Sequence, residues 1–193
     1  MEKMEIIITD LTRFTNPDIV CTAGINLATN ECIRPLPYLP TKKCRRLNIL
    51  PGAIIKGTFV ARPFIDPHSE DRSVHGQLSF KGPCNSKEFK SILEATESPS
   101  FEKGFSIALD DGQKHIPIET PPKISIITLS IDSGELSIVP DTFKPGKIKA
   151  IFRDNSGKHF RYLAITDLGF YNYAEKYSQS NRVDELNDFI HSQ

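Results

Sequence analysis

Short apolar runs and alternating stretches, broken by turn residues, fill most of this chain and predict a β-rich fold. Two of the apolar runs, residues 6–9 and 163–166, lead directly into an aspartate, Asp10 and Asp167. Each run predicts a buried strand that stops at the Thr-Asp pair. A second pair of similar phrases, residues 50–56 and 144–149, predicts a Pro-Gly turn that leads into a strand. The repeated phrases suggest two related β units.

Other strands are predicted from the same patterns, with proline and glycine marking their ends. An irregular segment is expected at residues 63–71, and turns are expected at residues 110–112 and 155–157. The predicted strands cover residues 19–25, 31–36, 53–61, 74–80, 105–109, 114–118, 124–131, 136–139, 147–153 and 158–165.

Two segments have a helical period instead. Between residues 84 and 97 the apolar positions fall on one helical face, and Asn85 with Glu88 forms the pattern of a capping box. Pro99 ends this mid-chain helix, which we expect to plug the bottom of a barrel or to bridge two of them. A C-terminal helix is predicted from Val183, Leu186, Phe189 and Ile190.

Composition narrows the classes of function. The 193 residues include 24 basic and 24 acidic ones, so no global field attracts the protein to nucleic acid or to an anionic membrane. Any such binding must come from a local patch. No apolar run is long enough to span a bilayer and no secretory signal is present, so we expect a cytoplasmic protein with no membrane partner.

The cysteine spacing gives no sign of a metal site, and the sequence contains no glycine-rich motif that would bind a cofactor. With no secretory signal we expect the thiols of Cys21, Cys32, Cys44 and Cys84 to be reduced, and because these cysteines form no C-x-x-C pair we expect no structural zinc and no other metal site. Cys44 is the one thiol between basic residues, a setting that lowers a thiol pKa. Phosphate-binding and dinucleotide-binding fingerprints are absent, so no cofactor is expected.

Short twisted strands in hairpins, with helices after several of them, are typical of the OB fold, a five-stranded Greek-key barrel. In the order of its phrases the chain resembles the dual OB-containing domain family of prokaryotic proteins. The matching phrases are Ile8-Thr9-Asp10-Leu11, Cys32-Ile33-Arg34-Pro35-Leu36, Pro67-His68-Ser69-Glu70-Asp71 and Leu163-Ala164-Ile165-Thr166-Asp167-Leu168-Gly169-Phe170-Tyr171. Gly169 departs from the family, where a basic residue is associated with that position. The resemblance implies a link to nucleic-acid modification or recognition.

We therefore expect a mainly β protein of two small OB-like barrels packed together, with a mid-chain helix and a C-terminal helix. Residues 1–100 would form the first barrel with the mid-chain helix. Residues 101–193 would form the second barrel with the C-terminal helix.

The segment His68-Ser69-Glu70-Asp71 has the densest set of ionisable groups outside a predicted helix. His68, Glu70 and Asp71 are candidate catalytic residues, because a histidine and two carboxylates can transfer protons or bind a divalent cation. An equally good interpretation is that these are solvated loop residues with no catalytic role. Asp10 and Asp167 could converge on the same site, but we favour local capping hydrogen bonds for both.

A basic and aromatic hairpin is the best candidate for ligand binding. Regular pairing would put Phe152, Phe160 and Tyr162 on one face, opposite Arg153, His159 and Arg161. OB folds bind single strands with a basic groove and stacking aromatics. An interpretation in which the rings lie in a core and the charges face solvent fits the alternation at least as well. The candidate nucleic-acid-binding residues are Lys147, Lys149, Arg153, His159 and Arg161, with Lys43, Arg45 and Arg46 in a second patch.

The sequence thus predicts a cytoplasmic protein that binds single-stranded nucleic acid or a nucleotide and has no catalysis of its own. One alternative is a metal-dependent enzyme that acts on nucleic acid through His68, Glu70 and Asp71. The other is an adaptor that recognises a protein partner encoded nearby in a multi-component system.

Overall fold

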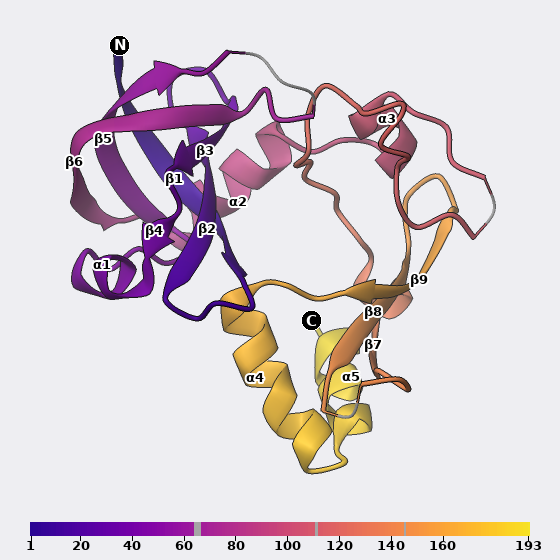
Figure 1. The fold of residues 1–193 in the computed structure, drawn as a ribbon. Helices are drawn as coiled ribbons and strands as arrows, with labels where there is room; N and C mark the ends of the chain where they lie inside the picture. Colours follow the sequence, from indigo (N-terminus) through magenta and orange to yellow (C-terminus); the bar gives the residue numbers. More distant parts are fainter. Residues whose placement is uncertain (64–66, 111, 145) are drawn as a thin grey trace. The chain divides into compact units, whose positions relative to one another are not determined.

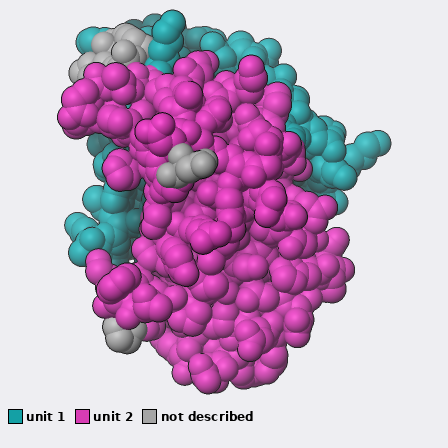
Figure 2. All heavy atoms as spheres, turned by 90° about the vertical axis from the view of Figure 1, so that its right-hand side faces the viewer, with its two compact units in different colours: residues 1–97, 123–126 teal, residues 98–122, 127–193 magenta. Residues whose placement is uncertain are grey.

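A computed structural model of the chain describes residues 1–63, 67–110, 112–144 and 146–193 (Figure 1). Parts of three sequence predictions lie outside the described residues: Asp111 and Pro145 of two expected turns, and residues 64–66 of the expected irregular segment. The chain divides into two compact units, which Figure 2 colours separately. The first unit contains residues 1–97 and 123–126, and the second contains residues 98–122 and 127–193.

The first unit is a closed β-barrel. Its elements are β1 (Glu2–Arg13), β2 (Ile19–Asn26), β3 (Cys32–Leu36), β4 (Leu39–Pro40), α1 (Thr41–Arg46), β5 (Ala53–Ala61), β6 (Asp71–Pro83) and α2 (Ser86–Ala95). The sheet runs β1–β5–β6–β3–β2, and an additional pairing of β1 with β2 closes it into five strands. The β3–β6 pair is parallel, and β4 adds to the edge of β2. The prediction of a mainly β fold with a barrel is confirmed to this extent.

The barrel interior explains the apolar runs. Ile6, Ile7 and Ile8 are all almost completely buried, as a continuous apolar run predicts for a strand covered on both faces. Ile33 and Phe59 are equally buried. Each such side chain contributes about 1.5–3 kcal/mol of transfer free energy, which makes the barrel the main hydrophobic core of this unit.

The prediction that the first strand stops at Asp10 is wrong. β1 shifts register between Ile8 and Asp10, which pairs with Ala23, and then continues to Arg13. A β-bulge at this point keeps the ladder going where a polar Thr-Asp pair suggested an end. A Cβ on Gly24 would lie 2.5 Å from the carbonyl oxygen of Ile7, so the two strands approach here only because that residue is glycine.

The second unit is built on a smaller sheet. Its elements are α3 (Phe101–Phe105), η1 (Ser133–Glu135), β7 (Ser137–Pro140), β8 (Ile148–Arg153), β9 (His159–Ala164), α4 (Leu168–Gln179) and α5 (Val183–His191). β7, β8 and β9 form an antiparallel sheet of three strands. Ile138 and Ile148 of this sheet pack with Tyr171, Ala174 and Leu186 of the two C-terminal helices. A second closed barrel is not confirmed among the residues that the structure describes.

Three strands predicted between residues 105 and 131 are wrong. Residues 101–105 are helical because Ser100 caps them, its Oγ accepting a hydrogen bond from the Lys103 N–H at 3.3 Å. Ser106 then takes a left-handed conformation, with φ of 55°, which breaks any extended run. Pro117, Pro121 and Pro122 have no N–H group to donate to a strand ladder. Residues 123–126 belong to the first unit.

The predicted helices are present. Asn85 caps α2, and Glu88 completes the capping box with a reciprocal hydrogen bond of 2.9 Å to the Asn85 N–H. No residue of α2 is fully buried. None of the helices in the described ranges is both long and apolar enough to cross a membrane.

Candidate functional site

The β8–β9 hairpin places two of its three aromatic rings in a core. Phe152 lies opposite Phe160, and the two rings stack with centroids 5.1 Å apart. Phe160 is 2% exposed and also packs against Phe101 at 4.9 Å. For these two rings the structure supports the interpretation as core residues.

Tyr162 departs from this pattern because the hairpin contains a bulge. Ala150 pairs with Leu163 and Phe152 pairs with Phe160, so Arg161 and Tyr162 together face one residue of β8. Tyr162 adopts a left-handed φ of 58°, which is unusual for a residue other than glycine or asparagine. The alternation expected from regular pairing is therefore wrong here. The Tyr162 ring is 50% exposed and is turned to the side that carries the charges.

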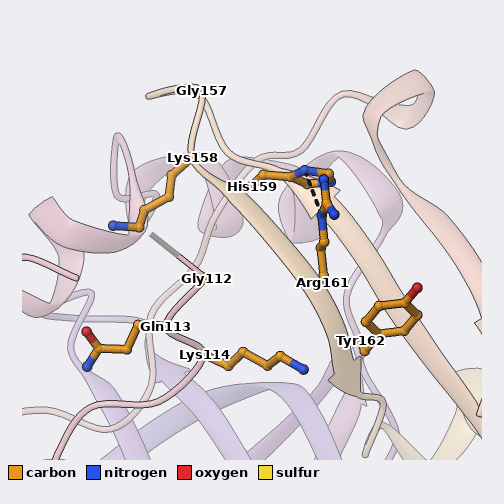
Figure 3. Close-up of a pocket in the computed structure, with 8 residues that line it drawn as sticks. All are labelled: Gly112, Gln113, Lys114, Gly157, Lys158, His159, Arg161 and Tyr162. Carbon is orange, nitrogen blue, oxygen red and sulfur yellow. Dashed lines mark hydrogen bonds between the residues drawn. The ribbon is translucent and has the colours of Figure 1, made fainter. Parts of the chain in front are cut away.

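A cavity of about 470 Å³ lies along this hairpin, and we call it the hairpin cavity (Figure 3). Its volume is within the range of about 300–1,000 Å³ that is usual for small-ligand sites. All of its lining residues belong to the second unit. They are Gly112, Gln113, Lys114, Gly157, Lys158, His159, Arg161 and Tyr162.

One cation lies beside the exposed ring, and a second lines the same cavity. The Lys114 ammonium is 5.5 Å from the centre of the Tyr162 ring, and Figure 3 shows this side chain extending toward it. Arg161 donates from Nε to His159 Nδ1 at 3.2 Å, so a neutral His159 holds its proton on Nε2. The cavity thus combines an aromatic face with exposed positive charge and a hydrogen-bond donor.

Lys158 lines the cavity but directs its charge elsewhere. Its ammonium lies 2.7 Å from Glu102 Oε1 and donates to the carbonyl oxygen of Leu109. The Leu109 N–H and Lys158 both donate to Glu102, and these bonds lower the pKa of that carboxyl. Lys158 therefore attaches the hairpin to the α3 segment, and Lys114 and Arg161 supply the cationic side chains of the cavity.

Asp154 holds the turn that carries these residues. Its carboxylate is 4% exposed and accepts hydrogen bonds from Ser156 Oγ at 2.6 Å and from the backbone N–H groups of Phe101, Ser156 and Lys158 at 3.0–3.1 Å. Burial alone would raise the pKa of Asp154, but these hydrogen bonds outweigh burial and lower it. The one acidic residue of the basic hairpin is therefore its structural anchor.

The other cations predicted for nucleic-acid binding are engaged outside the cavity. Lys149 lies 3.5 Å from Asp141, and Arg153 lies 3.4 Å from Glu135. Lys147 lies over the Tyr171 ring. Of the residues predicted on this hairpin, His159 and Arg161 line the cavity. Lys114 and Gln113 were missed, because their segment was assigned to a separate hairpin and the left-handed Tyr162 has no sequence signal.

The second predicted patch lies on α1 in the first unit. Lys43, Arg45 and Arg46 all fall within this short helix. Within the described part of the chain, none of the ion pairs involves these three residues. Phe14 and Tyr38, whose rings pack 4.7 Å apart, precede the helix in the same unit. Cys44, expected to be activated by its basic neighbours, is instead 4% exposed, and burial raises its pKa.

The predicted loop residues His68, Glu70 and Asp71 meet Arg34 of β3 and Ser125 of the segment 123–126. Arg34 Nε donates to Asp71 Oδ1 at 2.6 Å, and Ser125 Oγ donates to Glu70 Oε1. His68 Nδ1 lies 3.2 Å from Ser125 Oγ. Arg34 and Ser125 were missed as site residues, since pairing between residues 91 positions apart has no local signal.

This arrangement gives little support to a metal-dependent site. Across the residues that the structure describes, no group of three or more His, Cys, Asp or Glu side chains is placed to hold a metal ion. Asp71 faces Arg34, and Glu70 faces Ser125. All four cysteines are free thiols, in agreement with the sequence prediction.

The two Thr-Asp aspartates have different roles. Asp167 caps α4, its Oδ1 accepting a hydrogen bond of 2.6 Å from the Phe170 N–H, which confirms the capping prediction. Asp10 lies inside β1 rather than at a strand end. The strand end on which the capping prediction for Asp10 was based is therefore wrong, and the local hydrogen bonds of its side chain stay a prediction.

Comparisons of the chain with protein-family models, with curated proteins and with solved structures find no match.

Proposed function

We propose that this protein binds single-stranded nucleic acid, or a nucleotide, through the hairpin cavity and without catalysis there. One observation carries the proposal: the bulge at Tyr162 puts a half-exposed ring beside Lys114, in a cavity that Arg161 also lines. An exposed aromatic face accepts any base by stacking, and neighbouring cations attract the phosphates.

The energetics favour a single-stranded ligand over a duplex. Stacking of one base on an aromatic side chain contributes about 1–3 kcal/mol, and it requires a base that is not already paired and stacked. A cavity of about 470 Å³ suits a base with its sugar and phosphate. Arginine suits phosphate because its planar guanidinium donates two parallel hydrogen bonds.

We further propose that the first unit is an OB-like barrel and that the chain is a member of the dual OB-containing domain family. The closed order of five strands, with one parallel pair between β3 and β6, supports this assignment. OB barrels bind oligonucleotides, a precedent that applies to the first unit and not to the hairpin cavity of the second. The α1 patch of Lys43, Arg45 and Arg46 is then a second place for phosphates.

The proposal is tested by fluorescence anisotropy with a labelled 15-mer of deoxythymidine at low salt. We expect Tyr162→Ala to weaken binding roughly 5- to 150-fold, the equivalent of losing one stacked base. Tyr162→Phe should keep most of the affinity, because the ring remains. Arg161→Gln and Lys114→Gln should each weaken binding through loss of a phosphate contact.

Two variants serve as matched controls. Tyr173→Ala removes a tyrosine that is 43% exposed and lies on α4, outside the cavity. Arg153→Gln removes a charge from the same hairpin, also outside the cavity. Both should bind like the native protein. Equal losses in the control and cavity variants would contradict the proposed site, and stable capture of one protein partner without oligonucleotide binding would favour an adaptor.

A further inference from the structure

A hydroxyl, a carboxylate, a guanidinium and an imidazole meet in the first unit, at a place that the proposed function does not use. Ser125 Oγ donates a hydrogen bond to Glu70 Oε1, and the Ser125 N–H lies 3.5 Å from Glu70 Oε2. Arg34 Nη1 and His68 Nδ1 lie 3.4 Å and 3.2 Å from the same Oγ. A serine whose proton points at a carboxylate, with further donors at its oxygen, has the geometry of an activated nucleophile.

Glu70 is the group that is placed to take the proton. Its side chain is 3% exposed, and Arg34 Nη1 lies 3.9 Å from its Oε1. Asp71 fixes Arg34 through the 2.6 Å bond to Nε, so the carboxylate has a positioned positive partner. Glu70 is therefore oriented at Oε1 by Arg34 and the Ser125 hydroxyl, and at Oε2 by the Ser125 N–H, as a general base needs to be.

His68 does not complete a serine–histidine–acid relay of the usual order. In that relay the acid and the serine bind different ring nitrogens. Here His68 Nδ1 faces Ser125 Oγ at 3.2 Å and Glu70 Oε1 at 4.0 Å. With the serine proton on Glu70, Nδ1–H donates to Oγ, so His68 is a hydrogen-bond donor at the reacting oxygen.

The charges of the cluster select the class of substrate. Arg34 is matched by Asp71 and Glu70, and Arg72 donates to the carbonyl oxygens of Ser69 and Asp71. This balance leaves little attraction for a phosphate dianion, while a neutral carbonyl group meets no repulsion. The thiol of Cys32 is a poor competitor for the role of nucleophile, because burial, followed by the charge of Glu70, raises its pKa to about 12.

We propose that Ser125 is the nucleophile of an acyl-transfer site that takes a neutral carboxylic ester. Ser125 Oγ forms a bond to the carbonyl carbon as its proton moves to Glu70, and the carbonyl electron pair moves onto oxygen. Arg34 and His68 donate hydrogen bonds to Ser125 Oγ and stabilise the negative charge that develops there as the proton leaves. Collapse breaks the carbon–oxygen bond of the ester, and the alcohol leaves with the proton from Glu70. Water then hydrolyses the acyl-serine by the same route and restores Ser125.

The test is labelling of the full-length protein with a fluorophosphonate probe, followed by peptide mass spectrometry. The probe transfers its phosphonyl group to an activated serine with loss of fluoride. We expect native protein to be labelled at Ser125, and urea-unfolded protein to be unlabelled. Hydrolysis of p-nitrophenyl acetate should show a burst of nitrophenol as the acyl-serine forms. Because the labelled position is found on the unaltered chain, the result does not depend on a variant folding.

Variants then test the roles of Ser125 as the nucleophile and of Glu70 as the general base. Ser125→Ala should abolish labelling, and Glu70→Gln should slow it roughly 100-fold or more, since general bases contribute about 10²–10⁴-fold. Ser69→Ala, in the same loop, and Tyr173→Ala, in the other unit, should be labelled at the native rate. Native protein that is not labelled at Ser125, or a folded Glu70→Gln variant that is labelled as fast as native, would overturn the assignment. Neither result would bear on oligonucleotide binding at the hairpin cavity.

Discussion

At the scale of single residues, Tyr162 has the largest effect on the candidate binding site. Its left-handed backbone both forms the bulge and turns the ring beside Lys114. No residue type in the segment signals this, because tyrosine is a common strand residue and glycine is the usual choice at positive φ. The sequence therefore predicted the members of the hairpin but placed this ring on the wrong face.

The left-handed conformation predicts an unusual order of stability. With the ring removed, Tyr162→Gly should be more stable to unfolding than Tyr162→Ala by about 1 kcal/mol, because glycine adopts positive φ without the Cβ penalty. Urea denaturation measures the difference. At Arg161, for which no positive φ is found, the order should reverse, with glycine less stable than alanine. The same order at both positions would contradict the strained backbone.

Asp154 gives a prediction that depends on pH. Asp154→Ala leaves buried N–H donors without their acceptor and should cost about 2–3 kcal/mol at neutral pH. Because folding lowers the pKa of Asp154, its stabilisation is present above the unfolded pKa, which is about 3.9, and is lost as pH falls through the lower folded value. The gap in unfolding free energy between native protein and variant should therefore narrow below about pH 4.

An exposed aspartate gives the control for that measurement. Asp188→Ala, on the outside of α5, should change stability by no more than about 0.5 kcal/mol at any of these pH values. If the difference in unfolding free energy between native protein and Asp154→Ala stays constant down to acid pH, the charge of Asp154 is not what stabilises the turn.

At the scale of elements, the sequence predicted α2 and α5, but it also predicted three strands between residues 105 and 131 that do not form in the described part of the chain. The Asn85–Glu88 capping box and the C-terminal helix depend on local sequence, and both are present as predicted, although Phe189 of α5 is 51% exposed. Strands depend on distant partners, so the pattern could not show that residues 124–126 would instead meet the His68 loop. The bulge between Ile8 and Asp10, at which β1 continues past Asp10, likewise depends on the pairing of β1 with β2.

The cap of α4 can be tested directly. Asp167→Ala removes the acceptor for the Phe170 N–H and should destabilise the protein by about 0.5–2 kcal/mol in urea denaturation. Oligonucleotide affinity should be unchanged in the folded variant, because Asp167 is outside the hairpin cavity. Asn172→Ala, exposed on the same helix, should be neutral or slightly stabilising, since alanine is the better helix former. Loss of binding in folded Asp167→Ala would assign that residue a functional role.

At the scale of the whole molecule, the balanced charge of the chain determines how salt should act. With 24 basic and 24 acidic residues there is no long-range attraction, so salt dependence must reflect local phosphate contacts. If Lys114 and Arg161 neutralise two phosphates, the slope of log affinity against log salt for a single strand should be about −1.4. Arg161→Gln should reduce the slope by about 0.7, and Arg153→Gln should leave it unchanged. A slope near zero in the native protein would mean that phosphates are not bound.

The most direct test of the account is where a bound base lies. A single-stranded oligonucleotide that carries 5-iodouracil can be cross-linked by ultraviolet light to an aromatic residue stacked on that base, and the position can be mapped by mass spectrometry. We predict cross-linking at Tyr162, reduced by competing unlabelled oligonucleotide and retained in Tyr38→Ala. Cross-linking at Phe14 or Tyr38 of the first unit, with none at Tyr162, would contradict the hairpin cavity as the binding site.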